Sequence, residues 1–305
     1  MSVLVVGSIA LDTVKTPVEE HADQLGGSAS YAAVGGSFFA PVNLVGVVGD
    51  DFPESAFEFW QARKIDTSGV QRAQGQTFRW SGEYAWDLNT RETKSVALNV
   101  FENFKPELPE KFRETQFVLL ANIAPSLQSH VLDQMRKPRF VVADTMDLWI
   151  ETTRKDLDAL LPRVDLLILN DSEARQMTGD TSLIRAGRAL RRMGPKYVAV
   201  KKGEHGALLF GPDDFFSCGA YPLEDIHDPT GAGDTFAGGL AGYLAGSSEG
   251  EITFADLRRA VIFGSVLASF NVEAFSLDRL RRLTNDEIED RYEMFRLMSQ
   301  FEVLP

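Results

Sequence analysis

Short runs of apolar, often β-branched residues alternate with amphipathic segments along most of the chain. Near-continuous apolar runs of this length are typical of strands in a parallel sheet that is covered on both faces. The runs are residues 3–9, 42–48, 117–120, 140–143, 166–170 and 197–201. Segments of helical periodicity separate several of them, for example residues 53–64 and 126–136. This alternation predicts an α/β fold with a doubly wound, mostly parallel sheet, in which ligands bind where strands end.

Two stretches do not fit the alternation. In residues 77–87 large rings share one parity and polar side chains share the other, which predicts a strand with one apolar face. The rings are those of Phe78, Trp80, Tyr84 and Trp86. Residues 93–101 repeat the period of two after a turn at 88–91, so the two stretches together predict a hairpin outside the main sheet.

The polar residues 12–24, which follow the first strand, are assigned to the same accessory layer. The sequence therefore predicts one α/β domain over residues 1–305, with a small β-strand lid built from inserted segments at about residues 12–24 and 76–101. From residue 253 onward the pattern is helical, and Asp256 and Asp286 lie near the expected helix starts.

The apolar face of the hairpin has two interpretations. Four large rings are costly to leave in water, so we expect them to be covered. They pack either against the main domain or against the lid of a second subunit, which would make the chain a homodimer. Alternatively, Phe78 or Trp80 stacks on a nucleobase.

Composition and charge narrow the class of protein. With 305 residues, 44% of them hydrophobic and 25% charged, the chain is typical of a globular protein and not of a disordered, collagenous or coiled-coil one. A formal charge of −13 argues against nucleic acid or an anionic membrane as the main partner.

No apolar stretch reaches the length of a membrane span, and residues 1–14 resemble a first strand rather than a signal peptide. A lone cysteine, Cys218, and four histidines argue against a disulfide or a zinc site, and we expect a cytoplasmic location.

The segment 228–239, DPTGAGDTFAGG, carries the clearest chemical signal. Gly231, Ala232 and Gly233 lie directly before an apolar helical run, so their backbone N–H groups can converge on an anion at a helix N-terminus. Asp234 falls on the first helical turn. Its carboxylate either caps the helix or accepts a proton from a hydroxyl group that attacks a phosphate.

The common nucleotide-binding motifs are absent from the sequence. There is no GxxxxGK[ST] and no GxGxxG after a strand, so neither a P-loop NTPase nor a simple dinucleotide-binding half is supported.

Three motifs, spread over essentially the whole chain, resemble those of the PfkB, or ribokinase-like, family of small-molecule kinases. The family signature D-T-x-G-A-G-D is similar to residues 228–234, with Pro229 inserted. A second signature resembles Gly26-Gly27, the small-residue helix after it, and the later Gly46, Gly49 and Asp51. The third, N-x-x-E after a central strand, is met by residues 170–173.

The resemblance implies ATP and Mg²⁺ as cofactors and a set of catalytic residues. Asp234 would be the general base for the substrate hydroxyl, and Gly231, Ala232 and Gly233 would form the anion hole for the transferred phosphoryl group. Asn170 and Glu173 would organise Mg²⁺ and its waters. From the residues alone, residues 170–173 are equally compatible with a helix cap.

Other positions are implied to bind the nucleotide or a cation. The sequence KKGEHG occupies the place of the family's T-x-G-x-x-G loop, where Lys202 offers a cation to the ATP phosphates and Gly203 and Gly206 form the turn. A plain β-turn is the alternative interpretation of this loop. Asp228 and Thr230 match positions that bind a monovalent cation such as K⁺ in several members of the family.

The acceptor site is implied by residues near the N-terminus. Asp12 matches an aspartate that hydrogen-bonds substrate hydroxyls, and Gly26 and Gly27 match a hinge that also contacts the substrate. Tyr31 stands where many sugar-specific members have Asn, so a substrate inferred from that Asn does not transfer to this chain.

Two functions follow from these observations. The first is an ATP-dependent kinase that phosphorylates a CH2OH group of a small sugar or nucleoside, with nucleosides favoured by the aromatic lid strand. The alternative is a non-catalytic sensor of such ligands that keeps the kinase fold. A nicotinamide-dependent oxidoreductase would need the dinucleotide fingerprint that the sequence lacks.

Overall fold

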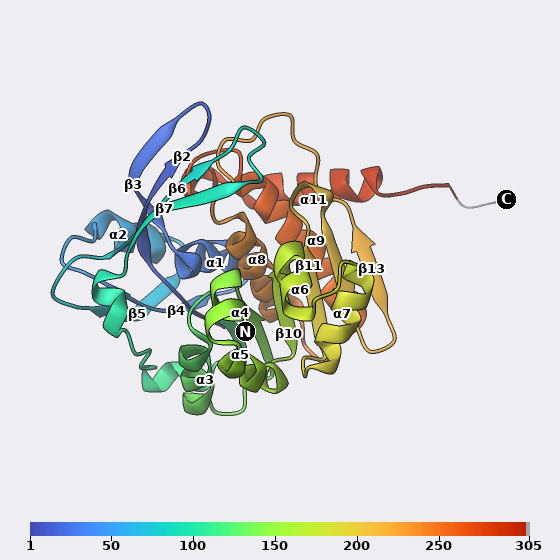
Figure 1. Cartoon of the computed structure of the whole chain (residues 1–305), viewed down its shortest axis with the longest axis horizontal. Helices are drawn as coiled ribbons and strands as arrows, with labels where there is room; N and C mark the ends of the chain where they lie inside the picture. Colours follow the sequence, from blue (N-terminus) through green and yellow to red (C-terminus); the bar gives the residue numbers. More distant parts are fainter. Residues whose placement is uncertain (303–305) are drawn as a thin grey trace.

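The computed structural model describes residues 1–302, and within them the strands form two separate sheets (Figure 1). The larger sheet has nine strands in the order β13-β12-β11-β10-β9-β8-β1-β4-β5. Neighbouring strands from β11 to β5 are parallel, and β12 and β13 run antiparallel. The strands are β1 (Val3–Val6), β4 (Val42–Val48), β5 (Ile65–Arg72), β8 (Phe117–Leu120), β9 (Phe140–Asp144), β10 (Leu166–Asn170), β11 (Tyr197–Lys201), β12 (Ala207–Phe210) and β13 (Phe215–Cys218).

All six predicted runs are strands of this sheet, so the predicted fold class is confirmed. The first strand is shorter than predicted, because β1 ends at Val6 and the chain then enters the small sheet at Ala10.

Helices cover both faces of the large sheet. They are α1 (Ser28–Ser37), α2 (Glu54–Ala62), α3 (Pro125–Gln134), α4 (Asp147–Thr152), α5 (Arg154–Leu160), α6 (Asp171–Thr178), α7 (Leu183–Arg192), α8 (Ala232–Ser247), α9 (Phe254–Asn271), α10 (Asp278–Arg282) and α11 (Asn285–Met298). Alternate residues of β1 show the two layers. Val3 and Val5 pack in a cluster with α1, α8 and α9, whereas Leu4 and Val6 pack in a cluster with α3.

Capping boxes fix the starts of the two long C-terminal helices. In α9 the Thr253 and Asp256 side chains bond each other's backbone N–H groups, and in α11 Thr284 and Glu287 do the same. The prediction that Asp256 and Asp286 lie near helix starts is confirmed. Within residues 1–302 no helix is both long enough and apolar enough to cross a membrane.

The small sheet has the strand order β3-β2-β6-β7 and lies beside α1 at one end of the molecule (Figure 1). Its strands are β2 (Ala10–Lys15), β3 (Glu20–Gly26), β6 (Phe78–Tyr84) and β7 (Arg91–Ala97). The predicted hairpin is therefore present outside the main sheet. Its turn is placed wrongly in the prediction, because β7 already begins at Arg91.

The expectation that all four rings are covered is wrong for Trp86. This residue lies beyond the end of β6, in the turn, and is 87% exposed. Tyr84 is buried, whereas Phe78 and Trp80 are partly buried. Phe78 stacks on Phe101 with 5.3 Å between ring centroids, so packing accounts for its ring.

Candidate active site

The predicted anion hole is the N-terminus of α8. Gly231 is the residue before the helix and has a φ of +75°, and a Cβ there would come within 2.3 Å of the Tyr31 ring. Ala232 begins the helix, and all three residues are partly exposed. In the described part of the chain the Gly233 and Asp234 N–H groups bond no backbone carbonyl, whereas the Ala232 N–H donates to the Pro229 carbonyl at 3.3 Å. The helix therefore presents free donors at a solvent-accessible end, as anion binding requires.

A buried ion pair lies beside this helix end. Asp144 ends β9 and Lys201 ends β11, and the Lys201 ammonium lies 3.3 and 3.4 Å from the two Asp144 carboxylate oxygens. A Cβ placed on Gly233 would lie 2.9 Å from the same ammonium. The ends of two parallel strands and one helix thus bring a cation to the anion hole.

Burial dominates the electrostatics of this cluster. It raises the pKa of Asp234 to about 7, with a further rise from Asp144, while Lys201 and Arg91 oppose the shift. Burial alone would lower the pKa of Lys201, but the carboxylates of Asp144, Glu173 and Asp234 raise it above its usual value. Asp234 therefore titrates near neutral pH, where a general base works best, and Lys201 stays charged.

Asp12 faces the same space from the small sheet. Its Oδ2 accepts a hydrogen bond from the Gly27 N–H at 3.3 Å, while its Oδ1 is buried and has no partner in the described part of the chain. Burial raises the pKa of Asp12 to about 7, and Asp228 and Asp234 add to the shift. A Cβ on Gly26 would come within 1.9 Å of the carboxylate, and Gly27 has a φ of +88°. The diglycine thus allows the carboxylate to pack against the backbone.

Two tyrosines line the space between Asp12 and α8. Tyr31, on α1, is buried, and desolvation together with Asp228 raises the pKa of its phenol well above the usual value. Tyr84, on β6, accepts a hydrogen bond from the Thr230 hydroxyl at 3.2 Å. The small sheet is thereby joined to the loop that precedes the anion hole.

Asp228 and Thr230 hold this loop to the end of α9. The two Asp228 carboxylate oxygens accept hydrogen bonds from the Thr230 and Ser276 N–H groups at 2.8 and 3.2 Å. The Thr230 carbonyl accepts one from the Asn271 amide at 2.8 Å. These oxygens retain further lone pairs, so they could also bind a monovalent cation. Their hydrogen bonds already hold the loop to the end of α9.

Asn170 and Glu173 form a capping box at the start of α6. The Asn170 side chain accepts from the Glu173 N–H at 2.8 Å, and Glu173 accepts from the Asn170 N–H at 2.7 Å. The helix cap considered as an alternative from sequence is therefore present. Burial raises the pKa of Glu173 to about 7, although Lys201 opposes the shift. One Glu173 oxygen remains for another ligand.

Within residues 1–302 no three His, Cys, Asp or Glu side chains converge as metal ligands. The residues here fit Mg²⁺ only as an ion that keeps its waters and is held chiefly by nucleotide phosphates, which is its usual mode in kinases.

The predicted nucleotide loop connects β11 to β12. Gly203 and Gly206 both have positive φ, at +54° and +83°, and a Cβ on Gly206 would come within 2.2 Å of the Cys218 carbonyl oxygen. Lys202 lies outside the strand, where its charge partly offsets the effect of burial on the pKa of the Cys218 thiol. Of the two lysines, Lys201 rather than Lys202 is therefore the one beside Gly233.

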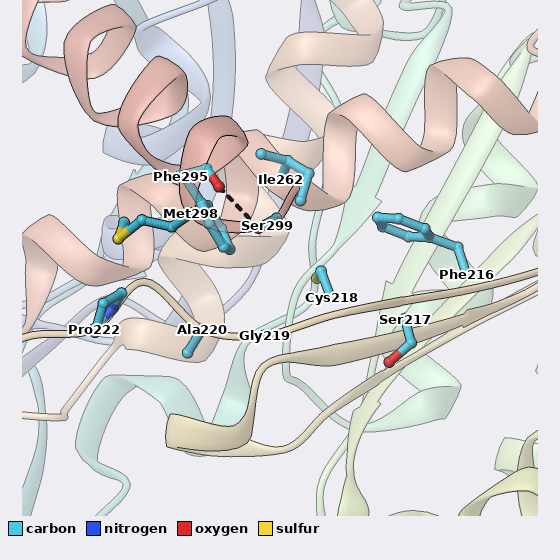
Figure 2. Close-up of a pocket in the computed structure, with 10 residues that line it drawn as sticks. All are labelled: Phe216, Ser217, Cys218, Gly219, Ala220, Pro222, Ile262, Phe295, Met298 and Ser299. Atoms are coloured by element: carbon cyan, nitrogen blue, oxygen red, sulfur yellow. Dashed lines mark hydrogen bonds between the residues drawn. The ribbon is translucent and has the colours of Figure 1, made fainter. Parts of the chain in front are cut away.

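A pocket of about 480 Å³ adjoins this loop, and Figure 2 shows its mostly apolar lining. Its walls come from β13 and the residues after it, from α9, and from the end of α11. They are Phe216, Ser217, Cys218, Gly219, Ala220, Pro222, Ile262, Phe295, Met298 and Ser299. The size and lining suit a flat organic ring system.

The hairpin of the small sheet reaches the nucleotide loop. In its turn, Asn89 donates a hydrogen bond to the Glu204 carboxylate at 3.3 Å. Arg91, the first residue of β7, lies with its guanidinium 5.3 Å from the centre of the Trp80 ring, and its charge opposes the burial that raises the pKa values of Asp12 and Asp234. The small sheet therefore reaches from Asp12 to the loop between β11 and β12.

Sequence reasoning missed three of these residues, namely Asp144, Lys201 and Arg91. Asp144 was detectable as an acid that directly follows an apolar strand, because strand ends in such sheets face the ligand. Lys201 lay within a recognised motif, but its neighbour Lys202 was chosen. Arg91 fell in the predicted turn, so no signal marked it.

Comparison with known proteins identifies the family of the chain. A family profile described as pfkB family carbohydrate kinase matches residues 2–280. The cytidine kinase of Thermococcus kodakarensis is 32% identical over 270 residues, which cover 85% of this chain and 95% of that protein. The nucleoside kinase of Methanothermobacter thermautotrophicus is 28% identical over 254 residues, or 81% of this chain and 78% of that protein.

Solved structures with a similar fold include a kinase of the same kind. The crystal structure of the Methanocaldococcus jannaschii nucleoside kinase, an archaeal member of the ribokinase family, superposes with a TM-score of 0.76. The superposition covers 96% of this chain and 98% of that one at 19% identity. The fold is therefore ribokinase-like.

Proposed function

This chain belongs to the pfkB family of carbohydrate kinases and is an ATP-dependent carbohydrate or nucleoside kinase, and we propose that its acceptor is the primary alcohol of a nucleoside. The observation that carries the proposal is Asp12. Its Oδ1 is buried and has no partner in the described part of the chain, and the charges of Asp228 and Asp234 act on this carboxyl group. A buried carboxylate oxygen without a partner is costly, and a substrate hydroxyl would supply the missing hydrogen bond.

The proposed reaction places each residue at one step. The acceptor hydroxyl oxygen forms a bond to the γ-phosphorus of ATP, and the bond from that phosphorus to the bridging oxygen breaks, leaving its electron pair on ADP. Asp234 takes the hydroxyl proton, for which a pKa of about 7 is well matched. The N–H groups of Gly233 and Asp234, at the α8 terminus formed by Gly231 and Ala232, stabilise the transferred group.

Nucleosides are favoured by the side chain next to Asp12. Asp12 and Trp80 are direct neighbours in the parallel pair β2 and β6, so both side chains lie on the same face of the small sheet. The partly buried Trp80 ring can then stack on a base while Asp12 binds ribose hydroxyls. The names of the cytidine and nucleoside kinases among the relatives support the same acceptor class.

The donor half of the site suits ATP. We place its adenine in the 480 Å³ pocket and its phosphates along Lys202, Gly203 and Gly206 towards the anion hole. When bound, Mg²⁺ would supply charge neutralisation of the phosphates, and Asn170 and Glu173 would hold its waters. Asp228 and Thr230 are the proposed ligands of a monovalent cation such as K⁺.

The proposal extends to partners and location. We propose a homodimer formed through the small sheet, because every residue of its edge strand β7 is exposed. Nucleic acid and membranes are not among the proposed partners, because the chain carries a formal charge of −13. The proposed location is the cytoplasm.

The test is ADP release from ATP with a panel of nucleosides, ribose and other small sugars. We expect the highest kcat/KM with a nucleoside, and a rise of kcat/KM with pH through about 7 as Asp234 loses its proton. Asp234→Asn is the control, with a loss of about 10²–10⁴-fold in kcat and retained ATP binding. Turnover of sugars alone would reject the nucleoside, and ligand binding without any ADP release would support the sensor.

A further inference from the structure

Lys201 is a buried cation that the reaction as described does not use. It is the last residue of β11 and lies opposite Asn170, the last residue of β10. Its side chain is only 18% exposed, and the carboxylates of Asp144, Glu173 and Asp234 all act on it. Burying a lysine ammonium is costly, so a position that keeps one needs a compensating role or a well-bonded partner.

Its bonding to Asp144 is loose. The two distances of 3.3 and 3.4 Å exceed the 2.7–2.9 Å typical of a charge-assisted N–H to carboxylate hydrogen bond. By contrast, Asp144 also accepts a hydrogen bond from the Thr145 N–H at 3.0 Å. The carboxylate is therefore fixed by the backbone, while the ammonium is held near it without being clamped and has donors free for another acceptor.

The predicted anion hole lies next to the Lys201 ammonium. A Cβ on Gly233 would lie 2.9 Å from the Lys201 ammonium and 3.6 Å from the carbon that bears it. Because Gly233 has no side chain, nothing on that residue separates the ammonium from the free N–H groups of Gly233 and Asp234. An anion bound to those N–H groups would meet the ammonium on its other side.

We propose that Lys201 is a catalytic residue that donates a hydrogen bond to a non-bridging oxygen of the transferred phosphoryl group, with Asp144 as the positioning residue that holds it there. The inference rests on the proposed phosphoryl transfer at this site, but not on the acceptor being a nucleoside. No proton leaves Lys201 in the step. The acceptor proton goes to Asp234, and the electron pair of the broken bond goes to ADP. The ammonium stabilises the negative charge on the phosphoryl group in the transition state.

Lys201 has a second conceivable role, that of a counter-ion which only neutralises Asp144. The two roles differ in a double variant. Lys201→Met alone leaves Asp144 buried and unpaired, whereas Lys201→Met with Asp144→Asn leaves a neutral pair of similar shape. If Lys201 only neutralises Asp144, the double variant regains activity. If Lys201 contacts the phosphoryl group, the double variant stays slow, although its fold is relieved of the unpaired charge.

The experiment measures kcat, KM for ATP and unfolding midpoint for wild type and both variants, using whichever acceptor the wild type phosphorylates. We expect Lys201→Met to lower kcat by about 10²–10³-fold, the cost of losing one transition-state donor. The double variant is expected to keep most of that loss. Lys196→Met, a surface lysine just before the same strand, is the matched control and is expected to behave as wild type. If Lys201→Met does not fold, the double variant alone carries the test.

A binding measurement separates this inference from the identity of the acceptor. ADP with aluminium fluoride mimics the transferred phosphoryl group, whereas ADP alone does not. We expect the double variant to bind ADP with wild-type affinity but to lose about 10²-fold or more in affinity for ADP with aluminium fluoride. Recovery of kcat in the double variant, or undiminished binding of the mimic, would overturn the proposal. A wild type that phosphorylates only sugars would reject the nucleoside and leave this test in place.

Discussion

At the scale of single residues, Asp12 shows how the site lowers the stability of the fold. Its carboxylate is 5% exposed and has a pKa of about 7, against 3.8 for the ordinary side chain. Between these two pH values the folded state holds a proton that the unfolded state releases. The folded state is therefore destabilised progressively as pH rises through this window, and the full cost is present above pH 7.

Asp12→Asn tests this cost. A neutral amide can still accept from the Gly27 N–H but never ionises, so we expect the variant to unfold less readily at pH 8, by on the order of 4 kcal/mol. The gain should be smaller at pH 5 and absent below the pKa of the unfolded side chain. Urea unfolding at both pH values measures it, with the exposed Asp213→Asn as control. Equal stability of wild type and Asp12→Asn at pH 8 would contradict the buried, costly carboxylate.

Gly233, at the start of α8, affects both the stability of the helix and the predicted anion hole. In Gly233→Ala the new methyl group would meet only the flexible end of Lys201, at 2.9 Å. Alanine also favours a helix over glycine by about 1 kcal/mol, so we expect unchanged or higher stability. Activity should fall about tenfold or more, because the methyl group displaces the ammonium and crowds the free N–H groups.

Gly233→Ala is best compared with Gly250→Ala, where a Cβ would have no neighbour within 4 Å. Assays of kcat and thermal unfolding on both variants separate the active-site effect from any general effect of the substitution. A fully active Gly233→Ala would mean that the phosphoryl group does not approach this helix end.

At the scale of elements, strand β6 carries the prediction on acceptor choice. Trp80 is held by its indole N–H, which donates to Thr93 at 3.2 Å, and by packing against Gly82. If this ring stacks on a base, Trp80→Ala should raise KM for nucleosides about tenfold while leaving the kinetics with free ribose unchanged. Trp86→Ala, in the exposed turn of the same hairpin, is the control. Equal losses with both acceptors would indicate a structural role instead.

The elements that the sequence predicted correctly are those with a clear hydrophobic pattern. The central strands are continuous apolar runs because both of their faces are buried, so their pattern survives without knowledge of the fold. Strand β5 was missed because its sequence, IDTSGVQR, mixes polar and apolar residues at the edge of the sheet. Trp86 was wrongly assigned to the apolar face of strand β6, because the alternation of apolar and polar residues does not show that β6 ends at Tyr84.

The sequence predicted those site residues that belong to a glycine-containing motif. It did not predict residues whose place in the site depends on how strands pair and which way a side chain leaves a strand. Gly27 occupies a position of positive φ, as the conformational freedom expected of the diglycine suggested, and Gly231 lies directly before the helix that its motif predicted. The choice between Lys201 and Lys202 depends on which side chain leaves the end of β11 towards α8, which spacing along the chain does not specify. Arg91 reaches the site only because β7 pairs with β6.

At the scale of the whole molecule, the small sheet is joined to the main domain on both sides of the site. Tyr84 bonds Thr230 before the anion hole, and Asn89 bonds Glu204 in the nucleotide loop. The same sheet exposes its edge strand β7, with Val96 54% exposed and Leu98, just beyond it, 43% exposed. The edge is unpaired and, although β7 also carries Arg91, Glu92 and Lys94, these two exposed apolar side chains could be covered by a second copy of this sheet.

Replacing Val96 and Leu98 together by lysine tests this dimer. Two charges on the exposed edge should prevent pairing, so sedimentation is expected to give about twice 33.8 kDa for wild type and 33.8 kDa for the variant. Because neither side chain is buried, the unfolding midpoint of the monomer should change little. Ile184→Lys, on α7 in the main domain, keeps the dimer and controls for added charge. A wild type that sediments as a monomer would reject the dimer, whereas a variant that stays dimeric would move the interface away from β7.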